Sequence, residues 1–160
     1  MNRNRINALI DQFEALYQGE PWLDETFVKK LENLDESRAF TRPMPNVHSV
    51  GEIISHLVAW RNDIVHRLQG NPRQLFMESP DNWTTNQELQ SEGWKALKER
   101  FATNQQALIA LLRERDDSFL NQVDEHSSTN ETFEYLLEGL VHHDCYHLGQ
   151  IGLIITILAQ

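Results

Sequence analysis

The sequence predicts an all-α fold, a four-helix bundle with a long crossover between its second and third main helices. Apolar residues recur at three- and four-residue intervals in four segments, which is the period of an amphipathic helix. No segment shows the strict alternation that is typical of a half-buried strand. Residues 71–85 contain two prolines and are expected to form the crossover. At 160 residues, the chain is expected to form a single domain over residues 1–160.

The first third of the chain contains one long predicted helix and one short one. A helix over residues 6–17 is expected to end before Gly19 and Pro21, because both residue types terminate helices. Residues 22–34 form a short amphipathic segment that is also predicted to be helical. A polar connection with two prolines follows it.

The second main helix has the clearest start in the sequence. Ser49 can cap its first turn while Glu52, three residues later, reaches back to the backbone of Ser49, as in a capping box. Apolar residues then form one stripe along the helix until Gly70 and Pro72 end it.

Two further long helices are expected in the second half of the chain. Residues 86–114 are interpreted as one continuous helix. The last helix is expected to begin near residues 129–131 and to continue towards the C-terminus. These two helices complete the predicted bundle.

Charge and composition exclude several classes of partner. The formal net charge is −10, which disfavours nucleic acid and anionic lipid as partners, because both bind basic surfaces. The single cysteine, Cys145, excludes an internal disulfide and fits a reducing compartment. The N-terminus lacks a signal-peptide pattern, and the most apolar run, residues 151–159, is too short to span a bilayer. We therefore expect a soluble cytoplasmic protein.

The last helix carries a cluster of polar residues, HHDCYH, at residues 142–147. At 100° per residue, His147 falls within the apolar face, His143 lies at its edge one turn earlier, and His142 points to the opposite side. Two imidazoles at positions i and i+4 can converge on one metal ion. The cluster is therefore expected to contain two inward histidines and one outward histidine.

A third metal ligand is expected from the helix that follows Ser49. His56 flanks the apolar stripe of this helix, whereas His48 and His66 face away from it and His126 lies in a loop. Three neutral histidines leave at least one position of a metal ion open, which is typical of a catalytic site. The spacing alone also allows the alternative that the inward histidines are only hydrogen-bonded in the core.

Several neighbours of the histidines have expected roles. Asp144 falls near the centre of the apolar face, so it is expected to bond to another helix or to a histidine N–H. Gln150 lies on the side of the histidine pair and can support a ligand. Tyr146 and Trp60 are candidates for a pocket wall, and Gly139 is expected to allow a close approach of helices.

With these residues identified, the chain resembles the DinB/YfiT-like superfamily of metal-binding four-helix bundles. The resemblance rests on the segments GEPWLDETF, HSVGEIISHLVAWRNDIVHRLQG, SPDNW and EGLVHHDCYHLGQI. In that family, one histidine of the second helix and the two of an H-x-x-x-H pair bind a divalent metal, which implies His56, His143 and His147 as ligands. The implied cofactor is a divalent metal ion, with zinc or nickel as first choices and iron, manganese or copper as further choices.

The resemblance implies a fold and a metal more strongly than a reaction. Related proteins include thiol-dependent S-transferases and hydrolases of reactive electrophiles. The implied function is therefore the metal-dependent transfer of a low-molecular-weight thiol to a small electrophile, with no catalytic residue assigned beyond the metal ligands. A metal-dependent hydrolase and a non-catalytic metal-binding bundle are the alternatives. The implied partner is a small-molecule substrate, with neither nucleic acid nor membrane.

The end of the last helix predicts a homodimer. Leu153 and Ile157 project away from the stripe that holds Ile154 and Leu158, so this segment is apolar nearly all round. One bundle core cannot cover both sides. A second subunit is the expected cover, and the N-terminal helix is the alternative.

Overall fold

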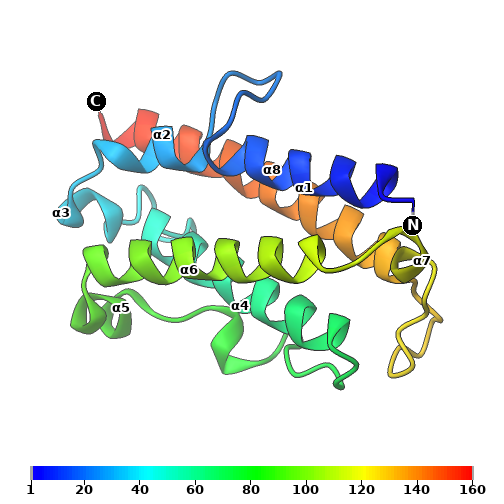
Figure 1. Cartoon of the computed structure of the whole chain (residues 1–160). Helices are drawn as coiled ribbons and strands as arrows, with labels where there is room; N and C mark the ends of the chain where they lie inside the picture. Colours follow the sequence, from blue (N-terminus) through cyan, green and yellow to red (C-terminus); the bar gives the residue numbers. More distant parts are fainter. Residues whose placement is uncertain (1, 160) are drawn as a thin grey trace.

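Four long helices carry the bundle: α1 (Asn4–Gln18), α4 (Val50–Leu68), α6 (Trp94–Arg113) and α8 (Phe133–Leu158). The computed structural model describes residues 2–159, and it contains helices and no strands among them, which confirms the all-α prediction. In the main packing contacts, α4 lies against α6 and α8, and α1 lies against the same two helices. α1 and α4 therefore occupy opposite corners of the bundle, as do α6 and α8 (Figure 1).

Short helical segments lie in the connections between the long helices. They are α2 (Phe27–Glu32), α3 (Glu36–Ala39), the 3-10 helix η1 (Pro80–Asn82), α5 (Asn86–Glu92) and α7 (Asp117–Leu120). The predicted crossover runs from the end of α4 through η1 to α5. The connection between α1 and α2 stands out from the body of the molecule at the top of Figure 1.

Capping side chains set the starts of the second predicted helix, which is shorter than expected, and of the last helix. Residues 22–34 are helical only within α2, whose first turn is capped by the Thr26 side chain. Trp22, in the loop before this cap, is 97% exposed. The last helix begins directly after Thr132, whose side chain caps it, close to the predicted start near residues 129–131.

The predicted single helix over residues 86–114 is divided in two at Gly93. This glycine has a φ of +88°, a left-handed conformation that side-chain-bearing residues rarely adopt, and it separates α5 from α6. A Cβ atom on Gly93 would meet nothing within 4 Å, so the backbone conformation and not a lack of space requires glycine. The apolar spacing continues across the break, which is why the sequence predicted one helix.

The core lies between the long helices and receives side chains from all four. Its largest fully buried apolar residues include Phe13, Ile54, Leu57, Phe101 and Leu112. None of the helices in the described part of the chain has the length and hydropathy that a bilayer crossing requires. On α8, Ile154 is buried whereas Leu153 is 63% exposed, so the two sides of this segment differ in their surroundings.

A buried ion pair ties α4 to α8 inside this core. Arg61 donates to the Asp144 carboxylate at 2.6 Å, and both side chains are 1% exposed. The Arg61 guanidinium also lies 5.1 Å from the centre of the Phe101 ring on α6. The prediction that Asp144 bonds to a neighbouring helix is therefore confirmed, and three of the four long helices meet at this pair.

Breaking this ion pair should destabilise the fold more than replacing it. Asp144→Ala leaves the Arg61 guanidinium buried without its counter-charge, which typically costs about 3–5 kcal/mol. The double variant Arg61→Met/Asp144→Leu should recover most of that loss. Free energies of unfolding from urea titrations test both expectations. Glu14→Ala, which breaks the exposed Arg113–Glu14 pair, is the control and should cost at most about 1 kcal/mol. An equal loss for Asp144→Ala and Glu14→Ala would contradict the prediction.

Candidate metal centre

His56 is placed by the start of α4. The Ser49 side chain accepts a hydrogen bond from the Glu52 N–H, the Glu52 side chain bonds back to the Ser49 N–H, and the predicted capping box is therefore present. His56 follows in the second turn and is 4% exposed. Its Nδ1–H donates to the backbone carbonyl of Asn82 in η1 at 2.9 Å, which turns Nε2 towards α8.

The structure brings His56 together with the two inward histidines of α8. His143 Nε2 lies 3.0 Å from His56 Nε2 and 3.1 Å from His147 Nε2. All three ligand atoms lie within 4.8 Å of one another. The three residues that helical facing predicted therefore form one cluster. Two of them, His56 and His143, are 87 residues apart in the sequence.

Hydrogen bonds at Nδ1 determine where two of the lone pairs point. Asn82 accepts from His56 Nδ1–H, and Gln150 Oε1 accepts from His147 Nδ1–H at 2.7 Å. The Nε2 atoms of both histidines therefore carry lone pairs directed at His143. The expectation that Gln150 supports a ligand is confirmed, and its amide nitrogen in turn donates to the Tyr146 hydroxyl at 2.9 Å.

Protonation of the imidazoles does not relieve the repulsion among these lone pairs. Burial and the neighbouring imidazoles lower the pKa of His143 to about 3 and that of His147 to about 4. Burial also lowers the pKa of His56. All three imidazoles are therefore uncharged at neutral pH. His143 can donate one hydrogen from Nε2 to one neighbour at most, whereas a cation between the rings can accept all three lone pairs. The donor set therefore fits a divalent metal ion.

Aromatic residues that the sequence did not assign to the site hold His56 from the side. Trp83 stacks on the His56 ring at 3.9 Å and 7°, and His48 stacks on the other face of Trp83 at 3.7 Å and 3°. His48, which was expected to face away from the apolar stripe of α4, precedes that helix and joins the pocket lining beside Trp83. Asn82 accepts from the Trp60 indole N–H at 2.8 Å as well as from His56. In the sequence, Asn82 and Trp83 were indicated only by the segment SPDNW, which contributes to the family resemblance.

The cluster lies on the floor of a pocket of about 730 Å³. Its lining is mainly apolar and aromatic and includes Trp60 and Tyr146, as predicted. Gly139 also lines the pocket, and a Cβ atom on it would meet nothing within 4 Å. The expectation that Gly139 allows a close helix contact was therefore wrong, and its missing side chain leaves the pocket open. The volume is that of a small-molecule site.

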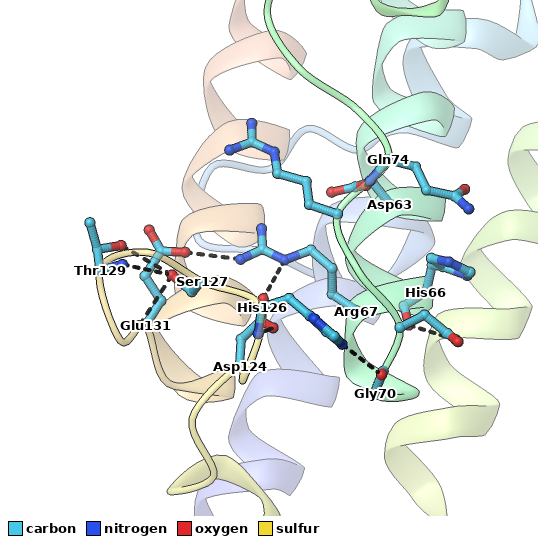
Figure 2. Close-up of polar contacts among 12 residues, drawn as sticks. Asp63, His66, Arg67, Gly70, Gln74, Asp124, His126, Ser127, Thr129 and Glu131 are labelled. Atoms are coloured by element: carbon cyan, nitrogen blue, oxygen red, sulfur yellow. Dashed lines mark hydrogen bonds and ion pairs between the residues drawn. The ribbon is translucent and has the colours of Figure 1, made fainter.

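The remaining histidines and the cysteine do not join the cluster. His142 is exposed and outside the cluster, as predicted, but it lines the rim of the same pocket and does not point to the opposite side. Cys145 is exposed outside the pocket, as the helical facing predicted. His126 bonds to the Gly70 carbonyl at 3.2 Å, at the C-terminal end of α4 (Figure 2). His66 lies on the opposite side of α4 in the same view. In residues 2–159, the three inward histidines alone form a group with metal-ligand spacing.

Comparisons with known proteins identify the family and the fold of the chain. The family model of the DinB superfamily matches residues 23–151, so the chain belongs to the DinB superfamily. A conserved protein from Enterococcus faecalis has the same fold, with a TM-score of 0.64 and 16% identity over 96% of this chain and 92% of its own. A search among curated proteins gives no match.

A second structural neighbour is YfiT from Bacillus subtilis. That protein is described as a probable metal-dependent hydrolase with an unusual four-helix bundle topology. The two structures align with a TM-score of 0.58 and 16% identity over 97% of this chain and 86% of YfiT. At this identity, both neighbours show a shared fold and leave the chemistry of the pocket to its own residues.

One divalent ion per chain should bind through His56, His143 and His147. His143→Ala and His147→Ala should each abolish stoichiometric binding, because two remaining imidazoles make a much weaker site. His142→Ala is the matched control on the same helix and should leave binding nearly unchanged. Calorimetric titration of tag-free protein with zinc and nickel measures this. Equal losses from His142→Ala and His143→Ala would show that the ligand assignment is wrong.

The stability of metal-free protein should fall as the pH is lowered from 7 to 5. Unfolded imidazoles bind protons with a pKa of about 6.5, whereas the folded cluster stays neutral, so protons favour the unfolded chain. Each buried histidine contributes at most about 1.4 kcal/mol per pH unit. Urea titrations of EDTA-treated protein measure the slope, and His143→Ala/His147→Ala should make it shallower. The same slope in both proteins would contradict the prediction.

Proposed function

We propose that this protein is a metal-dependent enzyme that joins a low-molecular-weight thiol to a small electrophile. The observation that carries the proposal is the cluster of three uncharged imidazoles on the floor of a pocket large enough for small molecules. His56, His143 and His147 would hold the metal, for which zinc and nickel are the first choices. No carboxylate of the described residues belongs to the cluster, so the protein supplies three neutral ligands.

The chemistry follows from this ligand set. When bound, a divalent ion with neutral ligands supplies Lewis acidity that lowers the pKa of a thiol or of water and so favours the nucleophilic anion. The chain's own residues orient the ligands: Asn82 fixes the His56 ring and Gln150 fixes the His147 ring. Trp60 and Trp83 form part of the pocket wall beside the histidines.

The surrounding acids favour a thiol over water as the nucleophile. Asp144 bonds to Arg61 in the core, and Glu131, at the far end of the pocket, bonds to Arg67. Both carboxylates are held by arginines, and Glu138, the other acid of the pocket lining, is exposed to solvent on α8. A thiol, with an ordinary pKa near 8.5, needs less help to ionise than water does. Cys145 lies outside the pocket, so the thiol would come from a small cosubstrate.

Hydrolysis is the second candidate, with water in place of the thiol. It is supported by the similarity to YfiT, which is described as a probable metal-dependent hydrolase. The same three histidines would hold the metal in that reaction, so the two candidates differ in the molecule that occupies the pocket and not in the centre.

Metal-loaded protein should accelerate the conjugation of monochlorobimane with at least one small cellular thiol. Bacillithiol and glutathione belong in the panel, and the increase in bimane fluorescence measures the rate. His147→Ala is the background and His142→Ala the matched control, because only the former removes a ligand. A rate above the His147→Ala background that EDTA abolishes is the expected result. If every thiol stays at background while p-nitrophenyl acetate is hydrolysed, hydrolysis replaces thiol transfer; if neither reaction occurs, the metal has a structural role.

We also propose that the protein is a homodimer through the C-terminal half of α8. The 63% exposure of Leu153 supports this, because a large exposed apolar side chain favours a partner surface. Analytical ultracentrifugation at micromolar concentration should give twice the mass of the 18.7 kDa chain. Leu153→Lys should shift the population towards the monomer. A wild-type mass near that of one chain would exclude the dimer.

A further inference from the structure

The pocket above the histidines contains two arginines that differ in their surroundings. Arg67, on α4, is buried and donates to Asp124 at 2.7 Å and to Glu131 at 2.9 Å (Figure 2). Its charge is therefore neutralised within the protein, and its hydrogens are directed at the loop before α8. Arg67 therefore connects α4 to the loop before α8 at the end of the pocket and is not available to a ligand.

Arg73, in the crossover after α4, has no such partner. Its Nε–H donates to the Leu75 carbonyl at 2.6 Å, and its guanidinium lies 5.4 Å from the centre of the Trp60 ring and 4.9 Å from that of Phe76. No carboxylate of residues 2–159 forms an ion pair with it, in a chain with 24 acidic residues against 14 basic ones. The backbone and two aromatic rings thus hold this cation in place while its terminal nitrogens stay unpaired.

Trp60 connects Arg73 to the candidate metal centre. One indole ring contacts the guanidinium and lies 6.0 Å from the His143 ring, measured between ring centres. Its N–H donates to Asn82, which also holds His56, so the position of Trp60 is fixed relative to the histidines. An unpaired cation and the three imidazoles therefore face one pocket with a single aromatic side chain between them.

We propose that Arg73 forms an anion subsite and that the molecule entering this pocket is a small organic carboxylate with an apolar or aromatic body. A planar guanidinium with two unpaired terminal nitrogens matches the two oxygens of a carboxylate. The body of the molecule would lie against Trp60 and reach the histidines. Glu138, a pocket residue with no ion pair, is exposed on α8 at the rim, so the anion lies on the Arg73 side. The inference rests on the proposed function only in treating this pocket as the substrate pocket.

The test uses metal-free protein, so that a carboxylate cannot bind to a metal. Benzoate, cinnamate and 2-naphthoate are titrated against their neutral primary amides, with binding followed by calorimetry and by ligand-observed NMR. At least one carboxylate should bind about tenfold more tightly than its amide, since a charged hydrogen-bonded pair contributes about that much. Arg73→Gln should remove the preference, and Arg73→Lys, which keeps the charge without the fork, should retain part of it.

Arg115→Gln is the matched control. Its guanidinium also packs on an aromatic ring, 5.1 Å from the centre of Phe119, but lies outside this pocket, so the preference should be unchanged. The subsite is refuted if no carboxylate binds better than its amide, or if Arg73→Gln binds carboxylates as the wild type does. Carboxylate binding that requires added metal also refutes it and leaves the metal centre intact. Arg73-dependent binding in protein that takes up none of zinc, nickel, iron, manganese and copper supports the subsite and rejects the proposed function.

Discussion

The buried ion pair between Arg61 and Asp144 is the constraint on which the site depends. It joins α4 to α8, and these helices carry His56 and His143 respectively. Apolar contacts tolerate small sliding movements, whereas separating a buried ion pair leaves two uncompensated charges in a medium of low dielectric constant. Asp144 directly follows His143 in the chain, so the pair sets the height and rotation of α8 at the point where the imidazoles must meet.

The polar groups of the site are arranged to keep the histidines neutral and oriented. Burial disfavours the protonated imidazoles, and the acceptors Asn82 and Gln150 hold the Nδ1 hydrogens away from the cluster. Such a site discriminates between cations, because it excludes the proton at neutral pH and suits an ion that bonds to several lone pairs at once. The acidic surplus of the chain lies outside the pocket, so the charge of the pocket lining differs from that of the whole protein.

The bundle and the pocket of this chain depend on different parts of its sequence. Structures with 16% identity share the bundle, because a bundle requires only the right pattern of apolar positions on four helices. The pocket is completed by connections: Trp83 follows η1, and Arg73 lies in the crossover. Connections can change without disturbing the core, so the chemistry of a pocket on this bundle depends on them. Substrate preference in this chain is therefore expected to reside in the crossover more than in the helices.

The sequence by itself determined the helical class, the start of α4 at Ser49, and the inward direction of His143 and His147. These features follow from local rules, since helical period and capping depend on residues within one or two turns. The same rules failed at Gly93, where apolar spacing continued through a left-handed residue. Only the tertiary structure decided that Arg61 pairs with Asp144, that Asn82 and His48 belong to the site, and that Arg73 stays unpaired. These relations join segments far apart in sequence through connections without a period, so their geometry exists only once the helices have packed.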